Sequence, residues 1–593
     1  MMHTSCIDTI NGPVVTVRGA AAFEMLEMVY VGKKRLIGEV IAVSAAATTI
    51  QVYESTTGLH PGEPVEGTGA PLCATLGPGI LQNIFDGIER PLRAMSDATG
   101  AFISVGFAIS PLDQDAVWDV TVTAAVGDKL TGGAVYATCP ETPLITHRCM
   151  VPPDLSGTVT WAAPNGQYRC NDPILRLSVN GEERTLTLCQ RWPIRTPRPV
   201  QQRRPISRPL ITGQRVIDTL FPIAKGGTAA IPGGFGTGKT MTQHQLAKWC
   251  DADIIVYIGC GERGNEMTQV LEEFSELIDP KSGHPLTART VLIANTSNMP
   301  VAAREASIYT GITLAEYYRD MGYSVAIMAD STSRWAEALR EISGRLEEMP
   351  AEEGFPAYLP SRISQFYERA GDMTTLGGRE GSVTIIGAVS PQGSDFSEPV
   401  TQNTKRFVRC FWALDKSLAY ARHYPAINWT LSYSEYMDDL SEWYRNNVSP
   451  EFQAQRQELL ALLHEESRLM EIVKLIGSDV LPDDQKLILE TARVIRTGFL
   501  QQNAYHKEDT YVPMDKQVRM MQLILNLHHK AVQLVTEKSI PVSAIEETDA
   551  FNRLVRMKYD VPNDHPEAFG PIWDEISAKL DALQAPRKEG DAV

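Results

Sequence analysis

The sequence lacks the features that would place this chain inside a membrane. Across its 593 residues no apolar run reaches the roughly 18 residues that a membrane span needs. Residues 1–22 contain no basic segment followed by a long apolar core, so we expect no secretory signal. Any association with a membrane is therefore expected to come through partners, and we expect a peripheral protein.

Cysteine patterns that would indicate a metal or disulfide framework are also missing. The nine cysteines are odd in number, are scattered along the chain, and include no pair at C-x-x-C spacing. We therefore expect reduced thiols, as in a cytosolic protein, rather than structural zinc or disulfide bonds.

Positive charge is in short supply. The 55 lysines and arginines face 72 aspartates and glutamates, which gives a net charge of −17. Because a broad nucleic-acid binder is usually basic, this balance argues against that class, although it leaves a local basic groove open. The hydrophobic share of 43% is ordinary for a globular protein. At roughly 150 residues per domain, the length suggests about four domains.

The N-terminal third of the chain has the pattern of β structure. Short runs of β-branched residues separated by Gly- and Pro-containing turns predict a small barrel over residues 1–70. Residues 71–200 place strand-like pieces between recurring Gly and Pro, which predicts a linker plus a β-rich insertion. The predicted strands are residues 12–17, 28–31, 49–53, 117–123 and 157–161.

The segment 195–209 is rich in Pro and Arg. We interpret it as a solvated linker into the next domain, in preference to a phosphate or nucleic-acid patch.

The second half of the chain predicts an α/β domain followed by helices. In residues 201–435, nearly continuous apolar strands alternate with helical patterns, as in a parallel sheet covered by helices. In residues 436–593 apolar residues recur at helical spacing, which predicts a helical domain with packed cores. The predicted strands are residues 254–258, 291–294, 325–329 and 383–386, and the helical stripes are Leu469, Ile472, Val473 and Ile476, and Met520, Leu523, Ile524 and Leu527.

The strongest chemical signal is a glycine-rich loop between a short apolar run at 229–231 and a helical pattern at 241–249. It matches G-x-x-x-x-G-K-[ST], in which backbone N–H groups surround phosphate oxygens at a helix N-terminus. Lys239 would reach the β- and γ-phosphates and the Thr240 hydroxyl would ligate Mg²⁺. The loop reads Gly233-Gly234-Phe235-Gly236-Thr237-Gly238-Lys239-Thr240.

Carboxylates follow two of the predicted strands. Asp330 ends the strand 325–329, where it suits a Mg²⁺ ligand, although capping of the next helix is an alternative role. Glu262 and Glu266 follow the strand 254–258, at the edge where open parallel sheets bind ligands. Glu262 could polarise the attacking water and Arg263 could balance phosphate charge. Spacing alone does not choose between Glu262 and Glu266, and a glutamate favoured by the helix dipole is the other reading.

Together with further segments, these motifs resemble the catalytic A subunits of V-type and A-type rotary ATPases, including the bacterial enzymes, over essentially the whole chain. The segments include Gly261-Glu262-Arg263-Gly264-Asn265-Glu266, the stretches 295–305 and 329–341, and His423-Tyr424-Pro425-Ala426-Ile427-Asn428-Trp429. The resemblance extends to the insertion at about 115–190, which looks like the bulge domain of A subunits. It implies a multidomain protein: an N-terminal β-barrel, a β-rich bulge insertion, a RecA-like α/β P-loop domain and a C-terminal α-helical domain.

The resemblance also implies roles for single residues. Lys239 and Thr240 handle phosphate and Mg²⁺, Glu262 rather than Glu266 orients the attacking water, and Arg263 and Arg334 line the phosphate region. Tyr424 and Tyr505 resemble the two aromatics that sandwich adenine, although their sequence context alone favours half-buried packing residues. Two positions depart from relatives: Thr237 stands where eukaryotic A subunits have Cys, so redox switching there is not implied, and Tyr505 stands where many relatives have Phe.

At the level of the assembly, the resemblance implies ATP or ADP and Mg²⁺ as ligands and B subunits as partners in an alternating A3B3 ring. A neighbouring B subunit would supply an arginine, and central-stalk and peripheral-stalk subunits would couple ATP hydrolysis or synthesis to a membrane sector that moves H⁺ or Na⁺. This places the chain at the cytoplasmic face of a membrane, with no nucleic-acid partner. The alternatives are a non-catalytic ring subunit, a RecA-like helicase or translocase, and a protein-export ATPase of the same superfamily.

Overall fold

The computed structural model describes residues 4–19, 23–100, 105–279, 282–478 and 480–584. It forms two compact units that share the chain discontinuously. The first contains residues 1–206, 225–230 and 252–408, and the second contains residues 207–224, 231–251 and 409–593. Among the described residues, no helix combines the length and apolar character that crossing a membrane requires.

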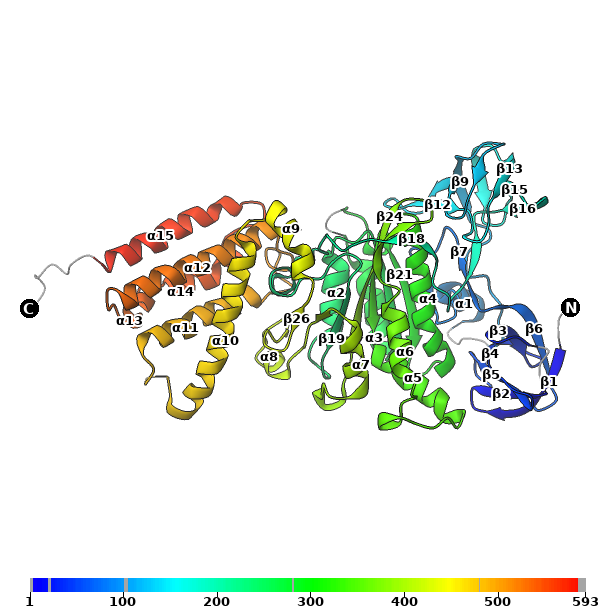
Figure 1. Ribbon diagram of the computed structural model, residues 1–593, viewed down its shortest axis with the longest axis horizontal. Helices are drawn as coiled ribbons and strands as arrows, with labels where there is room; N and C mark the ends of the chain where they lie inside the picture. The colour runs from blue at the N-terminus through cyan, green and yellow to red at the C-terminus, as the bar shows by residue number, and fades with distance from the viewer. Residues whose placement is uncertain (1–3, 20–22, 101–104, 280–281, 479, 585–593) are drawn as a thin grey trace, which may run out of the picture. The chain divides into compact units, whose positions relative to one another are not determined.

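The first unit begins with a closed six-stranded barrel, which confirms the predicted N-terminal barrel (Figure 1, blue). Alternate residues of its strands point inward, and Val15, Val29 and Val40 are fully buried in its core. In the order in which they pair, the strands are β1 (Thr4–Asn11), β2 (Val14–Arg18), β5 (Ala47–Val52), β4 (Leu36–Val43), β3 (Glu27–Val31) and β6 (Pro64–Pro71).

The β-rich insertion is also confirmed, as two four-stranded sheets that enclose one core (Figure 1, cyan). Ile174, Leu175 and Leu177 are fully buried in this core. One sheet has the order β10 (Lys129–Leu130), β13 (Gly157–Ala162), β15 (Leu175–Val179) and β16 (Glu182–Leu186). The other has the order β12 (Thr146–Met150), β11 (Val135–Pro140), β9 (Val117–Val122) and β14 (Gly166–Arg169).

A parallel sheet forms the α/β core of the first unit. Its strands lie side by side in the order β19 (Thr228–Pro232), β24 (Glu380–Val389), β22 (Ser324–Asp330), β20 (Ile254–Glu262), β21 (Thr290–Thr296) and β8 (Ile84–Phe85). The first eight residues of β20 are buried, as expected of a strand covered on both faces. Helices α3 (Gly264–Glu276), α4 (Val301–Asp320) and α5 (Thr332–Arg345) connect these strands.

Shorter elements complete the first unit. They are β7 (Cys73–Leu76), α1 (Leu92–Thr99), β17 (Gln190–Pro193), β18 (Val200–Arg203), α6 (Leu359–Tyr367), β23 (Gly371–Thr375) and α7 (Pro399–Phe407), with 3-10 turns at Leu286–Arg289, Glu352–Gly354 and Gln392–Ser394.

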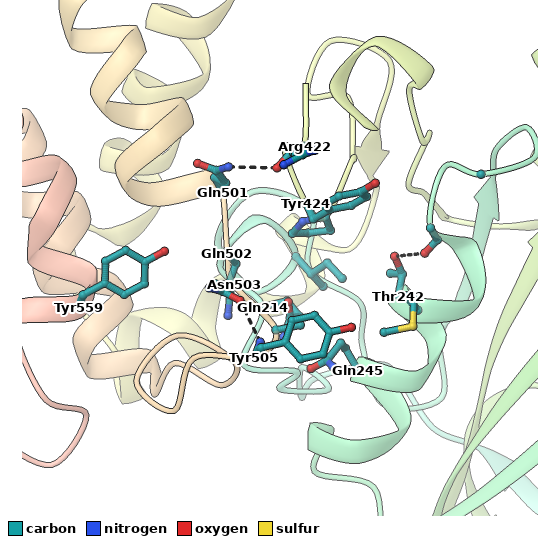
Figure 2. Close-up of a pocket in the computed structure, with 16 residues that line it drawn as sticks. Gln214, Thr242, Gln245, Arg422, Tyr424, Gln501, Gln502, Asn503, Tyr505 and Tyr559 are labelled. Atoms are coloured by element: carbon teal, nitrogen blue, oxygen red, sulfur yellow. Dashed lines mark hydrogen bonds between the residues drawn. The ribbon is translucent and has the colours of Figure 1, made fainter. Parts of the chain in front are cut away.

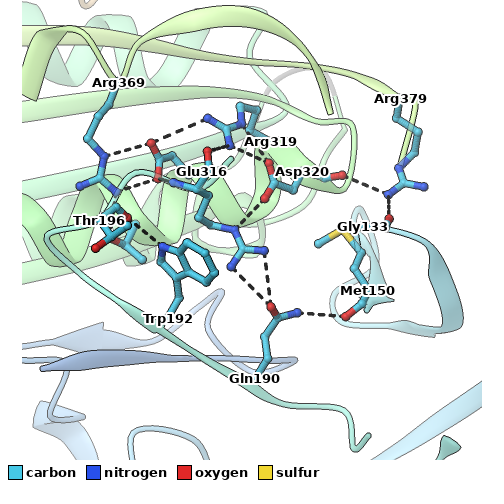
Figure 3. Close-up of polar contacts among 12 residues, drawn as sticks. Gly133, Met150, Gln190, Trp192, Thr196, Glu316, Arg319, Asp320, Arg369 and Arg379 are labelled. Atoms are coloured by element: carbon cyan, nitrogen blue, oxygen red, sulfur yellow. Dashed lines mark hydrogen bonds and ion pairs between the residues drawn. The ribbon is translucent and has the colours of Figure 1, made fainter. Parts of the chain in front are cut away.

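The interpretation of residues 195–209 as a solvated linker is wrong for its first arginines. Arg198 is 4% exposed, and its Nε lies 2.6 Å from Asp320 Oδ2. Figure 3 shows the surrounding network, in which Arg319 binds Asp320 and Arg369 binds Glu316. The partners on α4 lie more than 100 residues along the chain, so composition alone could not reveal that these charges are paired and buried.

The second unit is mainly helical beyond residue 436, as predicted (Figure 1, yellow to red). Its helices there are α9 (Met437–Asn447), α10 (Phe452–Ile476), α11 (Asp483–Val494), α12 (Met514–Thr536), α13 (Val542–Glu546), α14 (Ala550–Asp560) and α15 (Phe569–Ala582), with a π-helical turn, η5, at Ile495–Leu500 and a 3-10 turn at Pro566–Ala568. Before them lie a π-helical turn, η1, at Val216–Leu220, then α2 (Lys239–Trp249), β25 (Cys410–Phe411), α8 (Lys416–Tyr420) and β26 (Tyr433–Ser434).

The two predicted helical stripes differ in burial. Met520 and its three partners on α12 are all buried, which confirms a packed core there. On α10 Leu469 is buried but Ile472 is 39% exposed, so the interpretation of that stripe as core is wrong towards the end of the helix. The side chain of Ile476 lies outside the described residues.

Candidate nucleotide site

The glycine-rich loop lies between the end of β19 and the start of α2, as predicted. Gly238 precedes α2 with φ of 89°, a left-handed conformation that glycine adopts without the strain a Cβ would bring. The loop therefore brings its backbone to the positive N-terminal end of an 11-residue helix. This is the geometry of a phosphate cradle.

Side chains of the loop hold it closed on itself. Lys239 Nζ donates to the carbonyl oxygens of Gly233 at 2.8 Å and Gly234 at 3.0 Å. The hydroxyl of Thr237, which is 1% exposed, donates to Gly234 O at 2.8 Å. Phe235, inside the loop, is 80% exposed. The lysine ammonium is thus kept at the loop, where phosphate oxygens would be.

In the first unit, two carboxylates end neighbouring parallel strands. Glu262 is the last residue of β20 and Asp330 is the last residue of β22, and Gly259 pairs with Asp330 in the register of these strands. Asp330 is 2% exposed and accepts a hydrogen bond from the Tyr257 hydroxyl at 3.3 Å. A carboxylate buried at a strand end fits the role of a metal ligand, because Mg²⁺ prefers oxygen ligands.

The electrostatic environment of Glu262 is unusual for a glutamate. Burial, the charge of Asp330 and a hydrogen bond with Glu266 raise the pKa of Glu262 to about 8, against a smaller opposing effect of Arg334. Strongly shifted carboxyl groups gather at functional sites, since a proton acceptor works best with a pKa near the working pH. The raised pKa makes Glu262 a candidate proton acceptor on a ground that spacing could not supply.

The two predicted arginines flank this carboxylate pair. Arg263 precedes α3, is mostly exposed, and has its Nη1 3.9 Å from Glu266 Oε1. Arg334, in the first turn of α5, donates to Glu337 Oε2 at 2.8 Å, and this hydrogen bond raises the pKa of Arg334 above its ordinary value. Arg263 and Arg334 belong to the unit that contains Glu262 and Asp330, whereas residues 233–240 belong to the other unit.

A pocket of about 580 Å³ opens in the second unit beside the glycine-rich loop. Both predicted tyrosines border it, from different segments (Figure 2). Tyr424 is 43% exposed, and its Cε1 would lie 3.5 Å from a Cβ placed on Gly238. Tyr505 is 89% exposed, so the half-buried packing role suggested by its sequence context is wrong. Two accessible aromatic rings at one pocket suit a planar, uncharged ring of a ligand.

Other residues of the pocket were not predicted. They come from five separate segments: Gln214 and Ile217, then Met241, Thr242 and Gln245, then Arg422 and Pro425, then Gln501, Gln502, Asn503 and Ala504, and finally Tyr559 on α14. A signal was present where these residues adjoin predicted ones: Met241 and Thr242 follow the glycine-rich loop, Pro425 follows Tyr424, and 501–504 precede Tyr505. The rest are polar and apolar residues of ordinary type that become neighbours only through folding.

Fold and site together define a P-loop nucleotide-binding protein: a buried parallel sheet, a glycine-rich loop that opens a helix, and carboxylates at strand ends. Comparisons with known proteins agree with this class, because family matches cover successive parts of the chain. The ATP synthase alpha/beta family matches by its β-barrel domain at residues 7–69, its barrel-sandwich domain at 109–195 and its nucleotide-binding domain at 213–434. The C-terminal domain of V and A type ATP synthase matches residues 441–542.

Individual relatives are similar over almost their whole length. The V-type ATP synthase alpha chain 2 of Clostridium tetani is 60% identical over 574 residues, covering 97% of both chains. The V-type ATP synthase alpha chain of Halothermothrix orenii is 60% identical over 576 residues, covering 97% of this chain and 98% of that relative. The corresponding A-type ATP synthase chain of Methanopyrus kandleri is 56% identical over 575 residues, covering 96% of both.

The chain therefore belongs to the ATP synthase alpha/beta family, among the catalytic alpha, or A, subunits of the V-type and A-type ATP synthases. This confirms the resemblance noted in the sequence. Members of this family are enzymes that hydrolyse or make ATP and couple this reaction to ion transport.

The fold is shared more widely. The ATPase EscN of the enteropathogenic E. coli type III secretion system superposes with a TM-score of 0.62 at 21% identity, over 88% of this chain and 100% of EscN. At that identity the likeness shows the fold alone.

Proposed function

We propose that this chain binds MgATP through residues 233–240, Asp330 and the tyrosine-lined pocket, and that it hydrolyses or forms the bond to the γ-phosphate with Glu262. The observation that carries this proposal is the glycine-rich loop at the start of α2, with Tyr424 directly against its last glycine. A phosphate chain on the loop would place an attached base beside the two tyrosines.

Within this site each side chain has a distinct task. Loop N–H groups and the Lys239 ammonium would hold phosphate oxygens, while Thr240 and Asp330 would ligate Mg²⁺, which supplies charge neutralisation when bound. Tyr424 and Tyr505 would stack on the adenine ring.

The carboxylate of Glu262 would orient and deprotonate the attacking water, and this requires its ionised form. Arg263 and Arg334 would offset negative charge that develops on the γ-phosphate. The reaction is an in-line transfer of the phosphoryl group to water, for which positioning and charge stabilisation are the main contributions of a protein.

The family also supports an assembly. We propose that the chain alternates with B subunits in an A3B3 ring, that a neighbouring B subunit completes the site with an arginine, and that stalk subunits link the ring to a membrane sector that moves H⁺ or Na⁺. The chain would then lie at the cytoplasmic face of the membrane without entering it.

Binding of MgATP to the full-length chain tests the nucleotide site. Because Lys239 would donate charge-assisted hydrogen bonds to phosphate, Lys239→Ala should weaken MgATP binding about 10- to 100-fold in calorimetry. Lys248→Ala is the matched control, since Lys248 lies at the far end of α2, over the Trp249 ring. Equal affinities of wild type and Lys239→Ala would contradict the proposed phosphate site.

A further inference from the structure

Three buried cations lie in the second unit next to the segment that borders the pocket. Arg215 and Lys516 are 0% exposed and Lys558 is 3% exposed. Lysine and arginine are almost never fully buried unless they are paired, so each of these groups is expected to have a specific task.

The pocket segment, residues 501–505, has no regular backbone structure of its own. It follows η5, and no helix or strand is found between η5 and α12 within this described stretch. A segment without a ladder of backbone hydrogen bonds depends on other groups to satisfy its carbonyls and to fix its path.

Two of the cations satisfy carbonyls at the start of the pocket segment. Lys558 Nζ donates to Thr497 O at 2.7 Å and to Gln501 O at 3.0 Å. Arg215 donates to the same Gln501 oxygen at 2.8 Å and also to Phe499 O. The entry of the chain into the pocket is therefore held by two positive charges.

Arg215 also reaches Tyr505 through a chain of hydrogen bonds. Its Nη1 donates to Asp509 Oδ1 at 2.5 Å, and Asp509 Oδ2 accepts from the backbone N–H of Asn503 at 2.7 Å. Asn503 Oδ1 in turn accepts from the N–H of Tyr505 at 2.9 Å. The exposed tyrosine is thus tied to a buried guanidinium.

The third cation fixes the helix that carries Lys558. Lys516 Nζ donates to Lys558 O at 3.0 Å and Val561 O at 2.7 Å, at the end of α14. Burial and the nearby Arg215 lower the pKa of both lysines to about 8, which leaves them mainly protonated at pH 7. Asp509 and Glu508 offset part of this positive charge, and the backbone carbonyl acceptors help to stabilise the rest.

We propose that Arg215 and Lys558 are positioning residues for base recognition: they hold residues 501–505 so that Tyr505 lines the same pocket as Tyr424, where a purine ring would bind. The inference rests on the proposed function, in which this pocket receives the adenine of ATP. Removing either cation should release the pocket segment and weaken binding of the base, while the glycine-rich loop and its phosphate contacts stay intact.

The test compares a ligand that has a base with one that lacks it, at pH 7. Binding of MgADP and of magnesium pyrophosphate to the full-length chain is measured by calorimetry for wild type, Lys558→Met and Lys558→Arg. Stacking of a base on an aromatic ring depends on the position of the ring, and Lys558→Met should let Tyr505 move. The Kd of MgADP should therefore rise about tenfold, while the Kd of pyrophosphate stays unchanged. Lys558→Arg, which keeps the charge, should recover most of the affinity for MgADP.

Two further variants test whether the effect is specific to the hydrogen bonds that hold the pocket segment. Lys530→Met removes another partly buried lysine of the same unit, one that binds Ser577 and Asp581, and should change neither affinity. Asn503→Ala cuts the link to Tyr505 without unpairing a buried charge, and should also weaken MgADP alone.

The outcomes distinguish failure of the positioning role from failure of the proposed base-binding pocket. If Lys558→Met and Asn503→Ala both bind MgADP as well as wild type, or lose affinity for MgADP and pyrophosphate equally, the positioning role is overturned. If wild type itself binds MgADP no better than pyrophosphate, the pocket does not bind a base and the proposed function of the tyrosines fails first.

Discussion

Replacing Arg195 by methionine should leave two buried carboxylates without the guanidinium that neutralises them. Arg195 Nη2 lies 2.7 Å from Glu305 Oε2 and 2.8 Å from Glu39 Oε2, and the two glutamates are 3% and 1% exposed. Removing one partner of a buried ion pair costs about 3–5 kcal/mol, mostly because the remaining charge is uncompensated. By contrast, Arg198→Met should cost less, because Asp320 would keep Arg319 at 2.7 Å.

Amide hydrogen exchange on β4 and α4, which carry the two glutamates, reads this loss directly. A destabilisation of about 3–5 kcal/mol corresponds to protection lowered about 10²- to 10³-fold or more. Adding Glu39→Gln and Glu305→Gln to Arg195→Met should recover much of the protection, since the unpaired charges are then gone. Protection equal to wild type in Arg195→Met, or no recovery in the triple variant, would refute the reasoning.

Three other perturbations give separate expectations. Tyr424→Ala should weaken MgATP binding about tenfold or more and Tyr424→Phe should bind nearly as wild type, because stacking needs the ring and not the hydroxyl; equal loss in both, measured by calorimetry, would argue against stacking. In urea unfolding, Leu469→Ala should cost about 2–5 kcal/mol, whereas Leu475→Ala should change the free energy by no more than about 0.5 kcal/mol because that side chain is 86% exposed. Burial, the charge of Asp330, and the hydrogen bond and charge of Glu266 raise the pKa of Glu262, so its carboxylate forms only as pH rises. Glu266→Gln removes the part due to the charge of Glu266 and should move the acid limb of kcat/KM in the assembled enzyme to lower pH; an unmoved limb would contradict this coupling.

The sequence predicted best what is encoded in contiguous segments. The loop 233–240 and the strand ends at Glu262 and Asp330 could be recognised because a short run of residues carries both the motif and its structural context. The four parts of the fold followed for a similar reason, since alternating and helical hydrophobic patterns persist over tens of residues.

Features that depend on distant partners were not predictable in the same way. The sequence around Arg198 predicts a solvated linker, because its partner Asp320 on α4 lies far along the chain. The hydrogen-bond chain from Arg215 to Tyr505 likewise joins residues nearly 300 positions apart. Exposure was the other limit. A periodic apolar stripe predicts a helix but does not tell which of its turns other elements cover. The prediction of a helix at α10 is therefore confirmed, whereas the prediction that its stripe is buried throughout is wrong at Ile472.

The central claim is that Glu262 is the carboxylate that serves the attacking water, and turnover of the assembled Mg²⁺-ATPase tests it most directly. Glu262→Gln is compared with wild type and with Glu266→Gln, its nearest acidic neighbour on the same segment. Loss of a positioned proton acceptor should lower kcat about 10²- to 10⁴-fold with MgATP binding and assembly intact, while Glu266→Gln keeps substantial turnover at neutral pH. Near-normal hydrolysis by an assembly carrying Glu262→Gln would contradict the account and leave this chain as a nucleotide-binding subunit whose chemistry resides elsewhere.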